Sequence, residues 1–294
     1  MARVGFVGLG TMGLPMARRL VAAGHEVVAC DVDPERVAVL GGAVAATPAE
    51  AAAEADAVLV SLPSLEAVEE VMLGPQGLRA GAPPGTLAID LSTSSPSLAR
   101  RLAAELETLA VLDAPVSGGP RGAADGTLTV MVGGDAEAFE RARPLLEAFG
   151  TFVVHVGPSG AGQTAKLCNN LVAGATMAAI AEACAIASQE GLDPKLLYEL
   201  LTSSTGDSRV LRTRFPIAGA DDAHPSSNGY APLFALDLIA KDLGLALELA
   251  EQRGIEAAVA AAALVRYAEA QRAGHGELDY SAVFLTLPRA PEEE

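Results

Sequence analysis

A glycine-rich motif near the start of the chain has the spacing of a dinucleotide-binding turn. It reads Gly8-Leu9-Gly10-Thr11-Met12-Gly13. An apolar run at residues 4–7 precedes it, a helical pattern follows it, and Asp31 ends the next apolar run, 18 residues beyond Gly13. Glycines at this spacing let a pyrophosphate approach the backbone at a helix N-terminus, and the acid accepts hydrogen bonds from ribose hydroxyls. The motif therefore predicts a dinucleotide site, and Asp31, which would repel a 2′-phosphate, favours NAD over NADP.

Two further polar segments end predicted strands and would face the same ligand. They read Ser61-Leu62-Pro63 and Asp90-Leu91-Ser92-Thr93. Because ligands of open α/β sheets bind at the carboxyl ends of the strands, we expect Leu62, Pro63 and Thr93 to contact the cofactor. The hydroxyl of Thr93 would hold the ribose or the amide. The serines around Thr93 fit equally well as a cap for a helix that begins at Pro96.

A lysine and an asparagine open the longest helical pattern of the chain. Lys166 and Asn170 are four residues apart, so they share one helix face, with Leu167 and Leu171 beside them. A lysine at such a place is usually a surface residue that lays its stem on the protein. An ammonium and an amide on a buried face, however, would be costly without a ligand. The chain has three lysines against seventeen arginines, which suggests that Lys166 is retained because an amine is needed.

The segment Ser117-Gly118-Gly119 follows another predicted strand. It offers a hydroxyl and uncovered backbone N–H groups, which suit a carboxylate. Taken alone, it reads more simply as a glycine-rich turn.

The first half of the chain alternates β-branched runs with amphipathic stretches, which predicts a mainly parallel sheet covered by helices on both faces. The predicted strands are residues 4–7, 26–30, 57–61, 86–90, 110–112, 128–132 and 152–155. The predicted helices are residues 13–23, 34–40, 65–72, 97–106 and 136–148.

The second half reads as helices. Residues 163–189 carry apolar side chains at helical spacing and predict one helix of about 40 Å. Such a helix must be covered on most sides, at a domain or subunit interface. Residues 191–194 end it and start the next helix, and a polar loop is expected at residues 221–229. We therefore predict an α/β Rossmann-type doubly wound sheet at residues 1–162 and an all-α domain at residues 163–294, joined by the long interdomain helix.

Composition narrows the classes of partner. A net charge of −17 argues against nucleic acid and acidic membrane partners. The uncharged run 171–181 is shorter than the roughly 20 residues of a membrane span. The start shows no signal peptide, so a cytoplasmic protein is expected. Three separated cysteines predict reduced, buried thiols and no metal site, and the acidic tail at residues 291–294 is expected to be disordered.

Taken together, the chain resembles the β-hydroxyacid dehydrogenases and is most similar to their 3-hydroxyisobutyrate dehydrogenase branch. The motifs occur in family order along nearly the whole length. They are Gly5-Phe6-Val7-Gly8-Leu9-Gly10 with Met12-Gly13, Asp113-Ala114-Pro115-Val116-Ser117-Gly118-Gly119, Gly162-Gln163 with Lys166 and Asn169-Asn170, and Ala240-Lys241-Asp242-Leu243-Gly244-Leu245-Ala246.

The resemblance implies an NAD-dependent enzyme that oxidises a small 3-hydroxy acid to its semialdehyde. The best match is 3-hydroxyisobutyrate, which would place the enzyme in valine degradation. Lys166 would be the general acid/base, and Ser117, Gly118 and Gly119 would hold the substrate carboxylate with Asn170. Phe234 would lie near the nicotinamide, and Lys241 would contact cofactor or substrate. Family members are homodimers or homotetramers, so a homo-oligomer is expected.

Two alternatives stay open. A tartronate semialdehyde reductase, or a related glyoxylate or succinic semialdehyde reductase, would share these motifs. The segment at residues 202–211 departs from the 3-hydroxyisobutyrate enzymes, and it borders the substrate in that family. A non-catalytic NAD-binding dimerisation module is the alternative from another class, although relatives of that kind lose the lysine that Lys166 represents.

Overall fold

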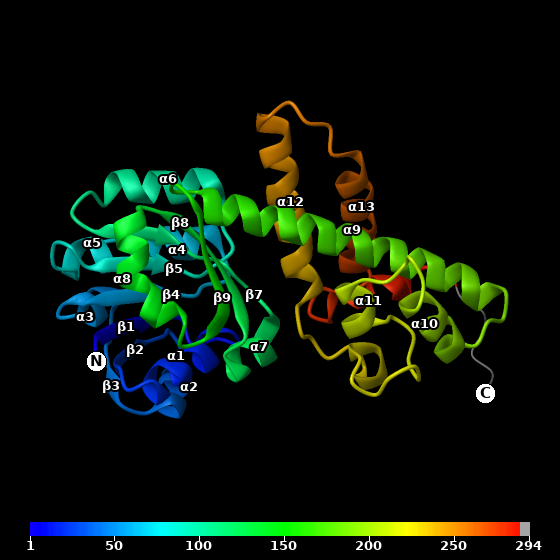
Figure 1. Cartoon of the computed structure of the whole chain (residues 1–294), viewed down its shortest axis with the longest axis horizontal. Helices are drawn as coiled ribbons and strands as arrows, with labels where there is room; N and C mark the ends of the chain where they lie inside the picture. The colour runs from blue at the N-terminus through cyan, green and yellow to red at the C-terminus, as the bar shows by residue number, and fades with distance from the viewer. Residues whose placement is uncertain (289–294) are drawn as a thin grey trace. The chain divides into compact units, whose positions relative to one another are not determined.

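The computed structural model describes residues 1–288, so the acidic tail at residues 291–294 lies outside the described residues. Within the described residues the chain forms two compact units, one up to Lys166 and one from Leu167, and Figure 1 labels most of their elements. The boundary predicted near residue 162 falls in the first turn of the helix α9 (Ala161–Gln189), which begins in the first unit and continues into the second.

Within residues 1–288, one sheet of nine strands forms the centre of the first unit, in the order β3-β2-β1-β4-β5-β6-β8-β7 with β9 paired to β8. Neighbouring strands from β3 to β6 are parallel. Strand β8 runs antiparallel to β6 and β7 and parallel to β9. The strands are β1 (Arg3–Val7), β2 (Glu26–Cys30), β3 (Ala43–Val44), β4 (Ala57–Val60), β5 (Leu87–Asp90), β6 (Ala110–Asp113), β7 (Val116–Ser117), β8 (Leu128–Gly134) and β9 (Gly150–Gly157).

Helices connect these strands, and several begin at side-chain caps. The Asp33 carboxylate accepts the Glu35 N–H at the start of α2, and Asp135 accepts two N–H groups at the start of α8. Such caps satisfy donors that the first turn leaves free. The helices are α1 (Gly13–Ala22), α2 (Pro34–Leu40), α3 (Pro48–Ala52), α4 (Leu65–Leu73), α5 (Leu78–Gly81), α6 (Pro96–Glu105), α7 (Gly119–Asp125) and α8 (Ala136–Leu146).

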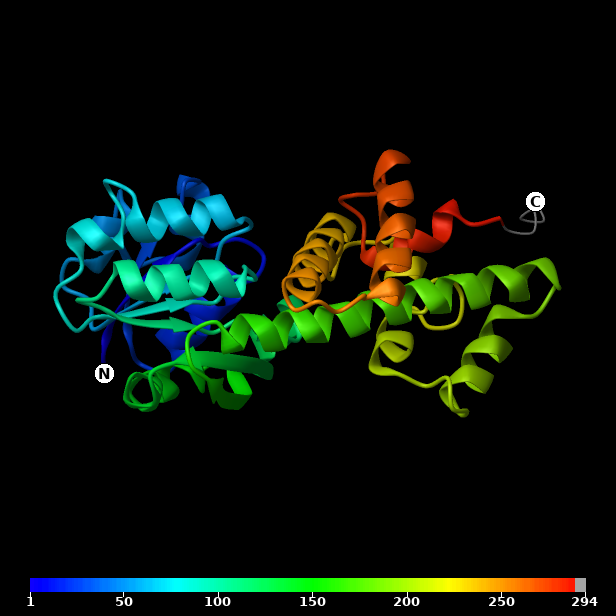
Figure 2. The same ribbon diagram turned by 90° about the horizontal axis from the view of Figure 1, so that it is seen from above.

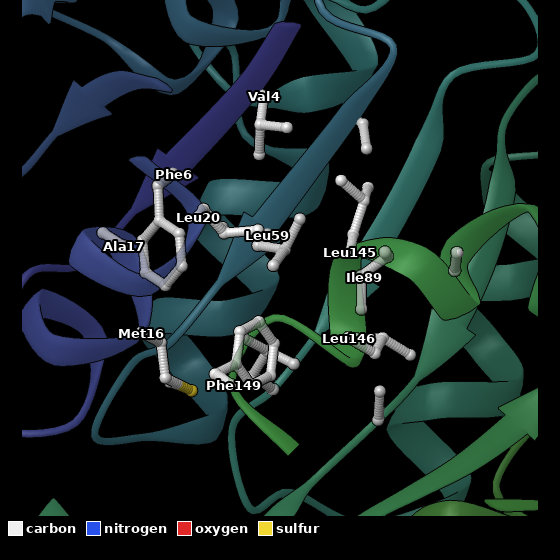
Figure 3. Close-up of a cluster of buried hydrophobic side chains, with 14 of the residues drawn as sticks. Val4, Phe6, Met16, Ala17, Leu20, Leu59, Ile89, Leu145, Leu146 and Phe149 are labelled. Carbon is white, nitrogen blue, oxygen red and sulfur yellow. The ribbon is translucent and has the colours of Figure 1, made fainter. Parts of the chain in front are cut away.

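Alternate strand residues pack into different cores, one on each face of the sheet. Val4 and Phe6 of β1 pack against α1, α2 and α8, as Figure 3 shows for the residues around Phe6 and Leu59. Val7 of β1 and Val58 of β4 pack against α3, α4, α5 and α6 on the other face. This follows from the period of two along a strand. The predicted doubly wound sheet with helices on both faces is confirmed.

The second unit is helical around its own core. Tyr267, which is fully buried, donates a hydrogen bond of 2.9 Å from its hydroxyl to the Gly174 carbonyl and so links α13 to α9. Figure 2 shows α9 as one unbroken green helix. The further elements are α10 (Pro194–Thr202), α11 (Arg209–Arg214), η1 (Pro225–Asn228), α12 (Leu236–Gln252), α13 (Ala258–Arg272) and η2 (Tyr280–Thr286).

Helix α9 is the one helix among the described residues that is long and apolar enough to cross a membrane. In its most apolar 18-residue stretch, 44% of the residues are buried inside the protein. Because the core helix of a soluble protein has the same length and composition, this finding by itself does not indicate a membrane.

Two local expectations were wrong. Cys168 is exposed, whereas Cys30 and Cys184 are buried; all three thiols are free. At 100° per residue, Cys168 falls outside the buried face of α9 that carries Lys166 and Leu167. The expected loop at residues 221–229 contains the short helix η1, in which Ser226 is buried. The Ser226 hydroxyl donates a hydrogen bond of 2.7 Å to the Phe215 carbonyl, which ties this segment to the rest of the unit.

Candidate active site

The glycine motif follows β1 and turns into α1, and two of its glycines are required by the packing of the turn itself. Gly8 has a φ of +93°, and a Cβ there would lie 2.3 Å from the Ser61 carbonyl oxygen. A Cβ at Gly13 would lie 1.9 Å from the Gly8 carbonyl oxygen. Neither contact is possible, so this turn can form only with glycine at both positions.

Gly10 differs from the other two glycines of the motif. A Cβ there would meet only the Nη1 atom of Arg36, at 3.7 Å. The protein itself therefore leaves room at Gly10, and no side chain of the described residues caps α1, which begins three residues later. An open glycine before an uncapped helix N-terminus fits the close approach of a pyrophosphate.

Asp31 follows β2 and lies against the same turn. Its Oδ2 accepts the Leu9 N–H at 2.5 Å, and its Oδ1 accepts the Asp33 N–H at 2.8 Å. The carboxylate is half-buried and lines a cavity of about 300 Å³ together with Gly8 and Leu62. The cavity and the fixed acid fit the adenosine half of a dinucleotide, in which Asp31 would accept hydrogen bonds from ribose hydroxyls.

Arg36 is the cation that would matter for a 2′-phosphate. Its Nε atom lies 3.2 Å from the Asp33 carboxylate, and both side chains are about half exposed. The guanidinium is thus already paired with Asp33. This arrangement agrees with the preference for NAD that Asp31 predicts.

The segments after β4 and β5 meet as expected for neighbouring parallel strands. The Leu62 N–H donates to the Ser92 hydroxyl at 2.9 Å. Ser95 caps α6 by accepting the Leu98 N–H at 3.1 Å. The capping alternative therefore holds for Ser95, whereas Thr93 lies half-buried between these serines, and its cofactor contact stays a prediction, as does that of Pro63.

Buried polar side chains gather where β5 and β6 end and α9 begins, a cluster that the sequence analysis did not predict. Its members are Asp90, Ser92, Ser94, Asp113 and Gln163, each at most 5% exposed. The Asp90 carboxylate accepts the Ser92 N–H at 2.9 Å and the Ser94 hydroxyl at 3.3 Å. Asp113 accepts the N–H groups of Gly160 and Gln163 at 2.7 and 2.9 Å.

Burial governs the acidity of both carboxyls in this cluster. Burial raises the pKa of Asp90 to about 6; the Asp113 charge adds to the rise, and hydrogen bonds from Ser92 and Ser94 oppose it. Burial also raises the pKa of Asp113, although backbone N–H groups of Gly160 and Gln163 counteract it. The two carboxyls beside the start of α9 are thus harder to ionise than carboxyls in water, because burial disfavours their charged forms.

Lys166 lies on this buried face of α9 and is 7% exposed. Gln163, Leu167 and Asn170 are buried on the same face, whereas Asn169 is exposed. The spacing of three, four and seven residues from Gln163 is that of one helical stripe. The structure therefore places Lys166 away from bulk solvent, unlike an ordinary surface lysine.

In the second unit, Asn170 and Lys241 share one carboxylate. The Asn170 amide donates to Asp242 Oδ2 at 2.6 Å, and Lys241 Nζ lies 3.1 Å from Asp242 Oδ1. Asp242, at 1% exposed, orients both of these candidate residues. Sequence reasoning placed Asp242 beside Lys241, but the link to Asn170, 72 positions earlier, required the fold.

The Ser117-Gly118-Gly119 segment joins a strand to a helix. Ser117 pairs with Thr129 at the end of β7, and Gly119 begins α7. Gly118 has a φ of +138°, and a Cβ there would lie 2.8 Å from the Leu128 side chain. The segment is therefore a strand-to-helix connection and not an isolated turn. Gly118 is exposed and has no side chain, so the backbone beside Ser117 stays uncovered, as a carboxylate site needs.

Phe234 is positioned by Asp279, a residue that sequence reasoning missed. The Asp279 carboxylate, fully buried, accepts the Phe234 N–H at 3.1 Å and lies 3.3 Å from Arg214 Nε. The Phe234 ring meets Tyr280 edge-on at 5.9 Å between centroids. A buried aspartate cannot be distinguished from a surface one by residue type, so no local signal marked it.

Comparison with known proteins gives matches over nearly the whole chain. A family model described as the NAD binding domain of 6-phosphogluconate dehydrogenase matches residues 3–157. A second, described as "NAD-binding of NADP-dependent 3-hydroxyisobutyrate dehydrogenase", matches residues 160–287. Both models describe NAD-binding regions, so the predicted cofactor NAD is confirmed, while the choice of NAD over NADP stays a prediction from Asp31.

Among individual proteins, the chain is 44% identical to the NAD-dependent L-serine dehydrogenase of Pseudomonas aeruginosa, over 96% of this chain and 97% of that one. The 3-hydroxyisobutyrate dehydrogenase of the same organism is also 44% identical, over 96% and 97%. A solved structure of Mycobacterium tuberculosis 3-hydroxyisobutyrate dehydrogenase with L-serine is 42% identical and covers 97% of this chain and 99% of that one, with a TM-score of 0.89.

Proposed function

Because the chain belongs to the β-hydroxyacid dehydrogenase family, we propose that it oxidises a small 3-hydroxy carboxylic acid to its semialdehyde, with Lys166 as the general acid/base. The observation that carries this proposal is the burial of Lys166 on the same face of α9 as Asn170. A 7% exposed amine followed one turn later by a buried amide suits a polar ligand better than solvent.

The chemistry divides between cofactor and protein. Bound NAD supplies the hydride acceptor. Lys166 takes the proton of the substrate hydroxyl as the hydroxyl carbon gives up its hydride, so the C–O single bond becomes a carbonyl. In the reverse direction the Lys166 ammonium polarises the carbonyl oxygen and returns the proton. A positioned proton-transfer group of this kind contributes about 10²–10⁴-fold in rate.

Substrate recognition depends on local donors, since a net charge of −17 gives an acid substrate no long-range attraction. The Ser117 hydroxyl and the uncovered backbone at Gly118 and Gly119 offer donors to the carboxylate. The Asn170 amide is held by Asp242 and adds a further N–H.

For the substrate itself we propose 3-hydroxyisobutyrate first and L-serine second. Both are 3-hydroxy acids and differ in the group on the central carbon, a methyl or an ammonium. L-serine is supported by the names of two relatives, the Pseudomonas aeruginosa L-serine dehydrogenase and the Mycobacterium tuberculosis structure with L-serine. The 3-hydroxyisobutyrate reading is supported by the larger set of similar proteins with that name.

We also propose a homo-oligomer located in the cytoplasm. Large apolar side chains are exposed on two helices of the second unit, at Val172 and Ile186 of α9 and at Val259 and Val265 of α13. Val172 and Ile186 are 14 residues apart and so lie on one side of α9, and an apolar patch at a protein surface is commonly covered by a partner. The small 3-hydroxy acid and NAD are soluble metabolites, which agrees with a cytoplasmic enzyme.

The test is NAD⁺ reduction, followed at the nicotinamide absorbance, with 3-hydroxyisobutyrate, L-serine, 3-hydroxypropionate, glycerate and 4-hydroxybutyrate. Each acid is also tested with NADP⁺. We expect one 3-hydroxy acid to be preferred with NAD⁺, and Lys166→Met to lower kcat by at least about 10²-fold. Lys195→Met, at an exposed lysine of α10, is the matched control and should keep the wild-type rate. Unchanged turnover by Lys166→Met would remove Lys166 from the chemistry.

A further inference from the structure

The first turn of α9 lies directly on the strand ends that precede it. A Cβ at Gly162 would lie 2.4 Å from the Met131 carbonyl oxygen and 2.5 Å from that of Asp113. A Cβ at Gly133 would lie 2.6 Å from the Asp113 carboxylate. The two glycines thus let the helix backbone touch β6 and β8 with no space left between them.

Gln163 joins this turn to a third segment, the one that follows β5. Its amide Nε2 donates to the Ser92 carbonyl at 2.8 Å, and its Oε1 accepts the Ser94 N–H at 2.9 Å. Its own backbone N–H donates to Asp113 at 2.9 Å. The side chain is fully buried. Its amide therefore both donates a hydrogen bond to the loop after β5 and accepts one from it, with no water to replace either.

We propose that Gln163 is a positioning residue, whose amide fixes the rotation of the first turn of α9 and thereby the place of Lys166. The inference rests on the proposed function of Lys166. Lys166 lies three residues further along the same buried face, so a rotation of the first turn carries the lysine with it. A displacement of about 1 Å at a reacting group can cost about 10²-fold in rate.

Filling space is a weaker explanation of this residue. An apolar side chain of the same size would fill the same volume without removing an amide from water. What the amide adds is direction, because a donor and an acceptor in a dry environment hold only one orientation of the helix. Lys166 is the first group downstream of this turn to which orientation matters.

The experiment compares Gln163→Met with the wild type in steady-state kinetics, NAD binding and the pH profile of kcat/KM. The assay uses the preferred hydroxy acid and NAD⁺. We expect kcat to fall about tenfold to hundredfold, NAD affinity to change less than about threefold, and the pH profile to shift. Thr164→Val is the matched control. It removes a hydrogen bond of 2.8 Å from the same turn, to the Gly160 carbonyl, without touching the loop after β5, and should keep the wild-type profile.

A second variant, Gln163→Glu, keeps the shape of the side chain. Its carboxylate can still accept the Ser94 N–H, but it opposes the Ser92 carbonyl unless it is protonated. We therefore expect the ratio of its kcat/KM to that of the wild type to rise as the pH falls. The charged groups around this position are Asp90 at the end of β5, Asp113 at the end of β6, Arg100 of α6 beside Gly160, and Lys166 itself.

The outcomes separate this inference from the proposed function. If Gln163→Met has the wild-type kcat and pH profile while Lys166→Met is inactive, the positioning role of Gln163 is overturned and the proposed function of Lys166 stands. A loss of activity in proportion to lost NAD binding, with an unchanged pH profile, would mean a purely structural role and also overturns the positioning role. If Gln163→Met does not fold, Gln163→Glu decides: a ratio of its kcat/KM to that of the wild type that stays constant across pH would also overturn the positioning role. Activity in Lys166→Met would instead contradict the proposed function.

Discussion

At the scale of single residues, the same residue type serves different purposes within one motif. Gly8 and Gly13 are glycines because the turn closes on itself there, with carbonyl oxygens within 2.3 Å of where a Cβ would be. Gly10 has open space beside it. The spacing of the motif predicted all three, but only the folded structure separates the glycines that fold the turn from the one that leaves room for a ligand.

This difference predicts opposite behaviour for two substitutions. Gly13→Ala should lower the free energy of unfolding by about 1–3 kcal/mol or more, because the methyl group meets a carbonyl oxygen. Gly10→Ala should leave stability nearly unchanged and weaken NAD binding at least about tenfold, or 1.4 kcal/mol. Denaturant unfolding and NAD titration measure the two quantities. Equal NAD affinity in Gly10→Ala and wild type would show that no ligand approaches this glycine.

Asp90 gives a residue-scale prediction about pH. Its pKa is raised from 3.8 to about 6 in the folded protein, chiefly by burial. The folded state therefore binds the proton more tightly than the unfolded chain, so this group stabilises the fold below about pH 4, and that stability is lost as the pH rises to about 6. The loss relative to Asp90→Asn should reach about 3 kcal/mol. Unfolding measured from pH 4 to 8 in both proteins tests this, and parallel curves would contradict it.

At the scale of elements, the start and the middle of helix α9 make different kinds of contact. Its start is held by hydrogen bonds to the ends of β5 and β6, through Gln163 and Asp113. Its middle packs in the helical core, where Gly174 lies against Leu243 and Ile239 of α12, with a Cβ position 3.0 Å from Leu243. Small residues along the middle let neighbouring helices approach, while the polar residues at the start provide direction.

The link between α13 and α9 can be tested with Tyr267→Phe. The variant loses the hydrogen bond of 2.9 Å from the hydroxyl to the Gly174 carbonyl and keeps the ring in the core. We expect the free energy of unfolding to fall by about 1 kcal/mol, the net value of one buried hydrogen bond, with kcat unchanged. Tyr198→Phe is the control, since its hydroxyl bond to the Arg212 carbonyl is 3.4 Å long and exposed. Equal stability of wild type and Tyr267→Phe would show that the ring alone matters.

At the scale of the whole molecule, the two units differ in what they contain. The first unit holds the dinucleotide motif, Ser117 and Lys166, and the second holds Asn170, Phe234 and Lys241. The first unit has two hydrophobic cores, one on each face of its sheet, and the second unit has one. The predicted site residues thus belong partly to each unit, and helix α9 begins in the first unit and continues in the second.

The exposed apolar side chains of the second unit predict self-association. Val265 is 56% exposed and Val259 is 73% exposed on α13. If a second copy covers the side of α13 that carries Val265, Val265→Glu should place a charge in an apolar interface and shift the protein toward monomers. Light scattering coupled to size-exclusion chromatography measures the mass. Arg272→Glu, at the exposed end of the same helix, is a control for charge. A wild-type protein that is already monomeric would contradict the proposal.

Local pattern determined much of this protein before the structure. The strand and helix sequence of the first unit, the glycine motif with Asp31, and the long helix with Lys166 and Asn170 all follow from periodicity and from residues close together in the chain. The structure adds short elements that sequence reasoning missed, β3, β7, α3, α5 and α7. Elements of two to seven residues are too short to show a repeating pattern of apolar and polar residues that could be recognised in the sequence.

Tertiary structure alone decided which polar groups share a site. The contacts of Gln163 with Ser92 and Ser94 and of Asn170 with Asp242 join residues about 70 positions apart. Nothing in the sequence indicated that Asp90, Asp113 and Asp279 would be buried. Their importance arises from burial, which the packing of whole elements imposes, because an unpaired carboxylate is costly only where water is excluded. Periodicity states which face of an element is buried, and only the assembled fold states what lies opposite that face.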